Sequence, residues 1–275
     1  MEGTGNMSFT IDLGGRAALV TGAGQGIGRA ICLSLAAAGA RVLVNDFVPE
    51  RAEAVAKEIA AAGGTAEARP FDVSDYAAVT AAVGAGPGVG ILVNNAGMAG
   101  PVDVDVSGAR GVPVSVGAFA STDPADWNRY FAVNLFGVMN CTRAALPAMI
   151  AAGEGRVITI VSDAGRVGEP NMAPYAAAKA GAAGFTRALA REVGRSGVTA
   201  NNVALATVDT VGLEDAARTS PQLADRLERQ LKRYMIPRFG QPADVAGLVT
   251  FLASPLASWI SGQTYPVNGG YSVSM

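Results

Sequence analysis

A tyrosine and a lysine stand four residues apart in a stretch that otherwise carries few functional groups. Tyr175 and Lys179 are separated by three alanines within the segment NMAPYAAAKAGAAGF, residues 171–185. Residues i and i+4 share one face of a helix, so the ammonium is expected beside the phenol. A free tyrosine has a pKa of about 10, and a nearby cation stabilises the phenolate and lowers that pKa. The pair therefore predicts a group that exchanges a proton with an alcohol or carbonyl oxygen, although an isolated pair of this spacing is more often a buried tyrosine and an exposed lysine.

A glycine-rich segment, TGAGQGIG (21–28), follows the first short apolar run and opens the first helical one. Glycines let the backbone turn tightly and approach a pyrophosphate, and the helix that follows offers free N–H groups. The spacing is G-x-x-x-G-x-G, with Gly22, Gly26 and Gly28, because Ile27 stands where G-x-G-x-x-G would need its third glycine. A lone glycine motif is as often a plain strand-to-helix turn, but its place at the first strand–helix junction favours dinucleotide binding.

Asp46 ends the second apolar run, 24 residues after Gly22. A carboxylate at this point can accept hydrogen bonds from the ribose hydroxyls of adenosine and repels a 2′-phosphate. Gln25, within the glycine segment, is neutral where an arginine could have paired with that phosphate. Both residues predict NAD rather than NADP; the alternative is that Asp46 only turns the chain before Pro49.

The composition excludes several kinds of chemistry. The chain has 275 residues, of which 50% are hydrophobic and 16% charged, and its net charge of −2 gives no reason to expect a nucleic acid as a partner. It contains no histidine, which excludes histidine triads and histidine-ligated zinc, and we expect no metal site. Cys32 and Cys141 lie in separate apolar runs and are expected as buried thiols. The first residues lack the pattern of a secretory signal, and the apolar runs are broken by charge or glycine short of a membrane span, so we expect a soluble, cytoplasmic protein.

Short β-branched runs alternate with alanine-rich runs of helical period along the chain. We expect strands at 16–21, 41–46, 91–95, 156–162, 198–205 and 263–268, with a weaker one at 66–73 that contains Pro70. We expect helices at 27–38, 50–62, 74–84, 125–152, 174–195 and 242–253. The alternation predicts right-handed crossovers and a parallel sheet, in one domain over residues 14–275 behind an N-terminal tail at 1–13. Two irregular segments, an extended loop at 98–123 and a substrate-loop region at 207–240 with a charged helix, are expected to be lids or binding loops.

Taken together, the motifs resemble the classical short-chain dehydrogenase/reductase family over nearly the whole chain. The resemblance is carried by TGAGQGIG (21–28), FDV (71–73), NNAG (94–97), Asn134 in VNLFG, Ser162 in IVSDAG, YAAAK (175–179) and SGQTYPVNGGY (261–271). Ser162 precedes Tyr175 by 13 residues, as in the family. The resemblance implies an α/β, Rossmann-like single-domain fold with a seven-stranded parallel sheet and helices on both faces. It also implies a homotetramer, in which the helices at 125–152 and 174–195 pair across one interface and the C-terminal segment contributes to another.

The same resemblance assigns roles to the matching residues. The catalytic group that it implies is Asn134, Ser162, Tyr175 and Lys179. Ser162 would hold the substrate oxygen while Tyr175 exchanges the proton, and Asn134 would stabilise a helix distortion and a water that links Lys179 to solvent. The implied contacts with the adenine, the ribose and the nicotinamide complete a set of cofactor-binding residues: Gly22, Gln25, Gly26, Ile27, Gly28, Asp46, Asp72, Val73, Asn95, Ala96, Gly97, Tyr175, Lys179, Val208 and Thr210. The family's Pro-Gly after the sixth strand is replaced here by Leu205 and Ala206.

These expectations describe an NAD-dependent oxidoreductase that transfers a hydride between a nicotinamide cofactor and a secondary alcohol or its ketone. The substrate is expected to be a small molecule that is apolar, cyclic or an acyl thioester, because the 98–123 segment is rich in valine and glycine. One alternative is an NADPH-dependent 3-oxoacyl-thioester reductase, against which Asp46 argues. Another is a dinucleotide-sensing binding protein without catalysis, which would be expected to lack Tyr175 or Lys179. A further possibility is that the 98–123 segment is a partner-docking loop.

Overall fold

Seven strands form one parallel sheet in the computed structural model, which describes residues 10–86, 88–98, 118–210, 212–213, 218 and 220–273. The sheet order is β3-β2-β1-β4-β5-β6-β7, and every neighbouring pair runs parallel. The bounds are β1 Ala17–Val20, β2 Arg41–Val44, β3 Thr65–Ala68, β4 Ile91–Asn94, β5 Gly155–Ser162, β6 Val198–Leu205 and β7 Thr264–Val267. The predicted seven-stranded parallel sheet is confirmed.

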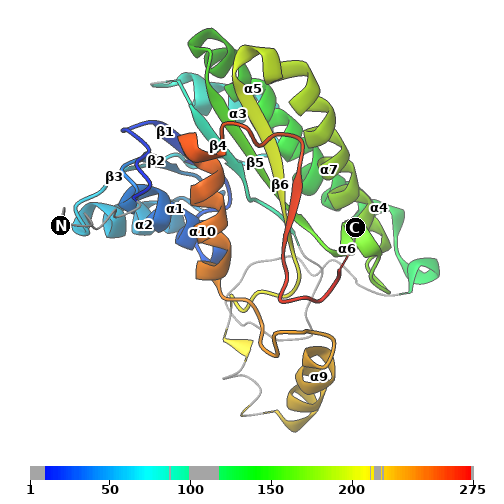
Figure 1. Cartoon of the computed structure of the whole chain (residues 1–275). Helices are drawn as coiled ribbons and strands as arrows, with labels where there is room; N and C mark the ends of the chain where they lie inside the picture. The colour runs from blue at the N-terminus through cyan, green and yellow to red at the C-terminus, as the bar shows by residue number, and fades with distance from the viewer. Residues whose placement is uncertain are drawn as a thin grey trace, which may run out of the picture.

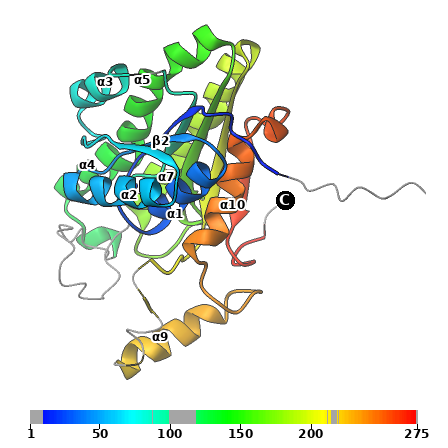
Figure 2. The same ribbon diagram turned by 90° about the vertical axis from the view of Figure 1, so that its left-hand side faces the viewer.

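Helices cover both faces of this sheet (Figures 1 and 2). One face packs against α1 (Gly26–Ala37), α2 (Pro49–Ala61) and α10 (Pro242–Ala253). The other packs against α3 (Tyr76–Gly84), α5 (Gly137–Ala152) and α7 (Ala173–Val193). The short elements are η1 (Phe119–Ser121), α6 (Ala164–Val167), η3 (Gly194–Ser196) and η4 (Pro255–Ala257). This three-layer arrangement is the predicted Rossmann-like architecture.

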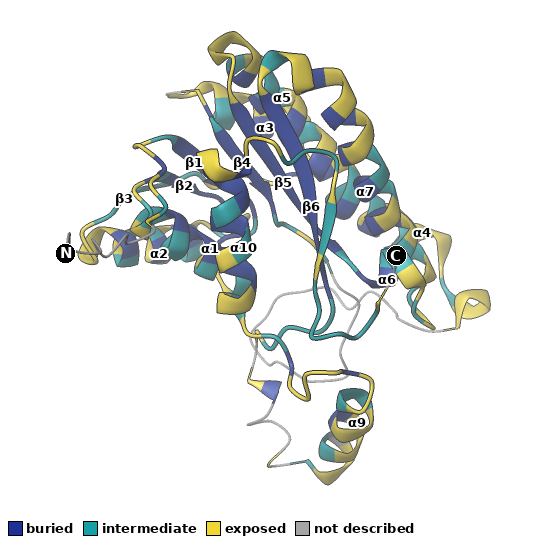
Figure 3. Ribbon diagram, viewed as in Figure 1, coloured by how far each residue is buried: buried dark blue, intermediate teal, exposed yellow. Residues whose placement is uncertain are grey.

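The strands form where the sequence is apolar and β-branched. β1, β4 and β6 are buried at every position, as Figure 3 shows for the centre of the sheet. Continuous burial without alternation is typical of strands that are covered on both faces. The weaker run at 66–73 is a strand only over Thr65–Ala68, because Pro70 has no N–H to donate to a ladder.

The apolar segment at 125–152 is helical throughout but contains one widened turn. α4 (Pro124–Phe131) is followed by a π-helical turn over Ala132–Phe136, which leads into α5. The helix over Pro124–Ala152 has the length and composition of a membrane span. Arg129 and Arg143 interrupt its apolar run, as expected from the sequence. Val138 and Cys141 on this helix are buried among the sheet-facing residues, so part of its apolar character belongs to the core.

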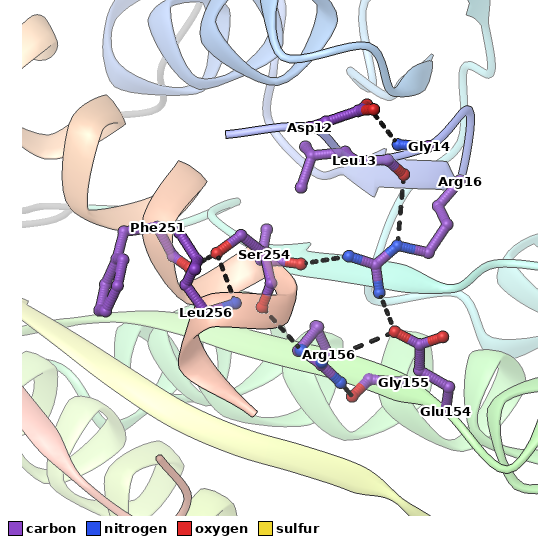
Figure 4. A network of polar contacts seen from close by, with 11 residues as sticks. Asp12, Leu13, Gly14, Arg16, Glu154, Gly155, Arg156, Phe251, Ser254 and Leu256 are labelled. Atoms are coloured by element: carbon purple, nitrogen blue, oxygen red, sulfur yellow. Dashed lines mark hydrogen bonds and ion pairs between the residues drawn. The ribbon is translucent and has the colours of Figure 1, made fainter. Parts of the chain in front are cut away.

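Arg16 and Arg156 form a polar network where β1 and β5 begin (Figure 4). Arg16 donates to the carbonyl of Ala253 and to the Glu154 carboxylate, each at 2.6 Å. Arg156 is 4% exposed, and its guanidinium lies 3.6 Å from the same carboxylate and donates to the carbonyl of Ser254 at 3.4 Å. The network joins the starts of two central strands to the end of α10, at the edge of the sheet opposite to the strand ends that carry Ser162 and Asn94.

The charged helix expected within 207–240 is α9 (Pro221–Leu231), which stands beyond the carboxyl ends of the strands (Figures 1 and 2). A small separate core of Leu213, Leu227, Tyr234 and Phe239 packs in this region. Most of the extended loop expected at 98–123 lies outside the described residues, which include only Met98 and residues 118–123 of it.

Candidate functional site

Close contacts shape the glycine loop between β1 and α1. Gly22 has a φ of 59°, and a Cβ there would lie 2.8 Å from Ala96 Cα. A Cβ on Gly28 would lie 2.3 Å from the Gly22 carbonyl oxygen, so neither position admits a side chain. Gln25 is the N-cap of α1, and its side chain makes no capping hydrogen bond. The first amides of α1 therefore remain available to an anion such as a pyrophosphate, and the loop fits a dinucleotide.

Asn95 and Ala96, which are expected to support the ribose, hold the glycine loop in place by hydrogen bonds with Thr21 and Gly22. The Thr21 hydroxyl accepts hydrogen bonds from the N–H groups of Asn95 and Ala96, both at 3.0 Å. The Asn95 side-chain amide donates to the carbonyls of Thr21 and Gly22, at 2.9 and 3.0 Å. Ile27 packs, partly buried, against the core. Thr21 was not among the predicted site residues, although a hydroxyl directly before the first glycine was a signal that could have found it.

Asp46 lies against the glycine loop, and both of its carboxylate oxygens already bind the backbone. Oδ2 accepts from the N–H of Gly24 at 3.1 Å, and Oδ1 accepts from the N–H of Val48 at 3.0 Å. Each carboxylate oxygen has a second lone pair, so the side chain can still accept from a ribose hydroxyl. The two roles considered for Asp46, ribose ligand and chain turn, are therefore compatible in one position.

In the FDV motif, Asp72 is exposed whereas Val73 is buried. Asp72 is exposed, and its Oδ1 accepts from the N–H and the hydroxyl of Ser74, at 2.8 and 2.7 Å. Val73 is buried, and a Cβ on Gly137 would lie 2.7 Å from its Cγ2. The valine side chain thus belongs to the core beside α5, and an adenine contact would have to involve its backbone.

Beyond β6 the chain returns to the glycine loop. Thr210 is exposed, and its Cγ2 lies 3.1 Å from where a Cβ on Gly26 would stand. Val208 forms a parallel bridge with Gly240 and packs partly buried against the core. Thr210 is therefore placed beside the turn at Gly26 in spite of the missing Pro-Gly.

Ser162 ends β5 and is held by the end of β6. It pairs with Leu205, whose carbonyl accepts from the N–H of Asp163 at 2.9 Å and from the Ser162 hydroxyl at 3.4 Å. Leu205 stands where the family has proline, and a leucine can continue the strand to this edge. The residue that replaces the family's proline thus takes part in the strand pairing next to the serine.

Tyr175 and Lys179 reach the same edge from α7, which has Pro174 in its first turn. Lys179 is 5% exposed, and its Nζ donates to the carbonyl of Ile160 at 2.9 Å. The same Nζ lies 5.9 Å from the centroid of the Tyr175 ring. Tyr175 is half-buried, and the Ser162 side chain stands near enough to its hydroxyl to lower its pKa. The structure therefore brings the serine, the phenol and the ammonium together.

Asn134 lies in the π-helical turn and is fully buried. Its Oδ1 accepts from the N–H of Met98 at 3.2 Å, and its Nδ2 donates to the carbonyl of Met98 at 3.1 Å. A Cβ on Gly97 would lie 2.9 Å from Asn134 Oδ1 and 3.2 Å from Lys179 Nζ. Gly97 thus lets three of the predicted residues approach one another. The helix distortion that the resemblance implies is this turn, a type frequent at functional sites.

The charge balance of the site differs from the sequence expectation. Burial, and to a smaller extent Tyr130, raises the pKa of Tyr175 above its ordinary value, although the Ser162 side chain acts to lower it. Burial also lowers the pKa of Lys179 from 10.5 to about 8. The expectation that the lysine lowers the pKa of the tyrosine is therefore wrong for the protein without its cofactor, because desolvation of the phenol outweighs a cation 5.9 Å from its ring.

Both cysteines are free and buried, as expected. Burial raises the pKa of the Cys141 thiol to about 12 and that of Cys32 further still, which makes both poor nucleophiles. Within the residues that the structure describes, no three cysteine or carboxylate side chains gather as metal ligands would.

Tyr130 is a residue of this site that the sequence patterns did not single out. It is 3% exposed, and its ring stands edge-on to that of Tyr175, with centroids 6.2 Å apart and planes at 68°. It lies four residues before Asn134 on the buried side of the same helical segment. That spacing is the signal that could have found it.

A parallel sheet with a glycine loop after β1, and a serine, a tyrosine and a lysine at the carboxyl edge, defines a dinucleotide-dependent oxidoreductase. Comparison with known proteins gives the family. Residues 16–220 match the family model for short chain dehydrogenase. A 3-oxoacyl-[acyl-carrier-protein] reductase of Staphylococcus aureus is 38% identical over 261 residues, which is 93% of this chain and 97% of that protein. A 7alpha-hydroxysteroid dehydrogenase of Escherichia coli is 34% identical over 267 residues, 96% of each chain.

A solved structure gives the same answer. The gluconate 5-dehydrogenase from Burkholderia cenocepacia, in complex with NADP and tartrate, superposes with a TM-score of 0.83 at 32% identity, over 97% of this chain and 98% of that one. The chain belongs to the short-chain dehydrogenase/reductase family. It is an oxidoreductase that acts on a CH–OH group of a small molecule with a nicotinamide cofactor.

Proposed function

We propose that this chain is an NAD-dependent dehydrogenase or ketoreductase of secondary alcohols, in which Tyr175 transfers the proton. The observation that carries the proposal is the convergence of Ser162, Tyr175 and Lys179 at the carboxyl edge of the sheet. Gly97 lies beside Lys179 and directly follows Ala96, which contacts the glycine loop, so the proton-transfer group lies near the dinucleotide site. When bound, the nicotinamide accepts or donates the hydride.

Each side chain then has a defined task. The Ser162 hydroxyl holds the substrate oxygen, and Tyr175 exchanges its proton with that oxygen. Lys179, with a pKa of about 8, is mostly protonated at neutral pH and supplies a positive charge near the phenol. Asn134 fixes the backbone of Met98 and thereby the widened turn that lies over Gly97. A water molecule held at this turn would link Lys179 to solvent.

Tyr175→Phe tests the proton-transfer role, because it keeps the ring and removes the hydroxyl. Loss of a general acid–base group costs about 10²- to 10⁴-fold in turnover. We expect that loss in assays of secondary alcohols with NAD, followed by the absorbance of the reduced cofactor, with NAD affinity unchanged in calorimetry. Tyr76→Phe, at an exposed tyrosine on α3, is the matched control. A wild type that binds NAD and turns over neither alcohols nor ketones would favour the dinucleotide-sensing protein instead.

The choice of NAD rests on Asp46 beside the loop and on the neutral Gln25. Asp46→Asn removes the charge and keeps one oxygen acceptor for the backbone, whereas Asp46→Ala would also release the N–H groups of Gly24 and Val48. We expect Asp46→Asn to raise kcat/KM with NADP relative to NAD, and Asp12→Asn at the opposite edge of the sheet to leave the ratio unchanged. A wild type that prefers NADPH would refute the assignment.

The second candidate is an NADPH-dependent 3-oxoacyl-thioester reductase, which the name of the Staphylococcus aureus relative favours. The NADP in the Burkholderia cenocepacia structure points to the same cofactor. Rates with a 3-oxoacyl thioester and a cyclic ketone, each with NADH and NADPH, separate the two proposals. The first proposal, an NAD-dependent dehydrogenase of apolar or cyclic substrates, predicts higher rates with the cyclic ketone and NADH.

We also propose a cytoplasmic homotetramer built from one domain over residues 14–275. The exposed side of α5 and the turn before it carries Phe136, Met139 and Ile150, and Trp259 near the C-terminal strand is 98% exposed. Apolar surface of this kind commonly marks a protein interface. Sedimentation should therefore report four times the mass of one chain, and Met139→Glu should lower it. Whether residues 98–123 cover the substrate or dock a partner is tested by their deletion, with turnover and mass as readouts.

A further inference from the structure

The catalytic tyrosine is in contact with a second tyrosine from another element. Tyr130 belongs to α4, whereas Tyr175 belongs to α7, so the contact joins two helices that lie far apart in the sequence. The ring centroids are 6.2 Å apart and the planes meet at 68°, which is the edge-on arrangement that aromatic pairs prefer. Tyr130 is 3% exposed, whereas Tyr175 is half-buried.

The position of Tyr130 is fixed by the widened turn that follows it. Asn134 binds both backbone polar groups of Met98, which anchors the helix four residues after Tyr130. The buried residues of this segment include Tyr130, Asn134, Val138 and Cys141, so the turn keeps the tyrosine on the side that faces α7 and the sheet. Asn134 therefore holds Tyr130 in place as well as the backbone near Lys179.

We propose that Tyr130 is a positioning residue for Tyr175: its ring fixes the orientation of the catalytic phenol toward Ser162 and keeps water away from it. This inference rests on the proposed role of Tyr175 as the proton-transfer group. At neutral pH the ring of Tyr130 carries the effect, because its edge-on contact with Tyr175 does not involve the hydroxyl. Burial and the nearby Asp126 raise the pKa of Tyr130, so this second phenol stays neutral at neutral pH. Once it ionises at high pH, its negative charge raises the pKa of Tyr175.

In the described part of the chain, few charged groups lie close enough to Tyr175 to affect its ionisation. Lys179 faces Tyr175 from its own helix, and Asp126 stands one turn before Tyr130. From the α6 side, Asp163 pairs with Arg166 at 2.5 Å and also binds the C-terminal segment. The hydration of Tyr175 therefore depends chiefly on what covers its ring, and that cover includes Tyr130.

The test uses a readout that needs no substrate. The ultraviolet absorbance of tyrosinate is titrated with pH in the wild type and in Tyr175→Phe, and the difference reports Tyr175 alone. The same pair of titrations is made in the Tyr130→Val, Tyr130→Leu and Tyr130→Phe backgrounds. Admission of water should make Tyr175 about tenfold more acidic in the valine and leucine variants. Tyr130→Phe keeps the ring and removes only the charge that Tyr130 carries when ionised, so its shift should be clearly smaller than that of the valine and leucine variants.

Turnover is the second readout. An aromatic pair is worth about 0.5–1.5 kcal/mol, so kcat should fall roughly 2- to 12-fold in Tyr130→Val with little change in KM, and Tyr130→Phe should restore it. Tyr76→Val, at an exposed tyrosine, controls for the substitution itself. An unchanged Tyr175 titration in both the valine and leucine variants overturns the inference, as does a phenylalanine variant that shifts as far as they do. A shifted titration in a protein without alcohol turnover supports the positioning role and refutes the proposed function.

Discussion

The buried ammonium of Lys179 should leave a measurable mark on the pH dependence of folding. Its pKa is lowered from 10.5 to about 8 because burial disfavours the charged form. A folded pKa below the unfolded value means that the folded protein releases its proton first. Between pH 8 and 10.5 the unfolded chain therefore binds more protons, and this group makes the protein more stable as the pH rises.

The magnitude follows from the same two values. One pKa unit corresponds to about 1.4 kcal/mol, so protonated Lys179 costs the fold about 3 kcal/mol at pH 7, and about 2.5 kcal/mol of this is recovered by pH 10. Lys179→Met removes the charge and keeps most of the chain length. The free energy of unfolding of this variant, relative to the wild type, should therefore be most favourable near pH 7 and should decline by about 2.5 kcal/mol at pH 10.

The assay is urea unfolding at several pH values between 7 and 10, at one protein concentration so that association contributes equally. Tyrosines with raised pKa values, such as Tyr175, destabilise both proteins alike above pH 10 and cancel in the difference. Lys57→Met is the matched control, since Lys57 has an 80% exposed side chain on α2. A difference between wild type and Lys179→Met that stays constant from pH 7 to 10 would falsify the buried, low-pKa lysine.

Two further predictions concern ion pairs away from the lysine. Glu154→Gln removes the carboxylate that Arg156 shares with a second arginine (Figure 4), and we expect a loss of about 1 kcal/mol in urea unfolding without a change in NAD affinity; equal stability would mean that the carbonyl acceptors suffice. Burial of Glu169 raises its pKa, but hydrogen bonds from Arg233 and Tyr271 have a larger opposite effect and lower it. The stability that this pairing contributes is therefore fully present above the ordinary carboxyl pKa, and it is lost as the pH falls through the pKa of the folded protein. Because Arg233 follows α9, Glu169→Gln should speed tryptic cleavage near α9 and raise KM more than it lowers kcat, and an unchanged cleavage pattern would argue against a tie between these segments.

The sequence predicted the elements and the motifs that they carry, because apolar periodicity and glycine spacing report local structure directly. The strand and helix order, the turn at Gly22 and the shared face of Tyr175 and Lys179 follow from such patterns. The patterns do not report how deeply a polar group is buried among residues distant in the chain. They therefore gave the wrong direction for the pKa of Tyr175 and did not place the Val73 side chain in the core.

The widened turn at Asn134 is a second feature that the local sequence pattern does not predict. A run of helix-forming residues from 125 to 152 predicts one regular helix, and only the family resemblance implied a distortion. The turn exists because the Asn134 amide binds the backbone of Met98, a contact across 36 residues that no local pattern encodes. Tyr130 became visible as part of the site for the same reason, since its partner lies on α7.

The two pKa directions together constrain how the proposed base works. In the free protein, burial makes the Tyr175 phenol less acidic and the Lys179 ammonium more acidic, so burial shifts both groups toward their neutral forms, although Lys179 with a pKa of about 8 stays mostly protonated at neutral pH. A phenolate at Tyr175 therefore needs more positive charge than this chain alone provides at 5.9 Å. The oxidised nicotinamide is such a charge and would bind at the same edge of the sheet. In the proposed mechanism Tyr175 would therefore stay a protonated phenol in the free protein, and a bound oxidised nicotinamide would supply the positive charge that lowers its pKa.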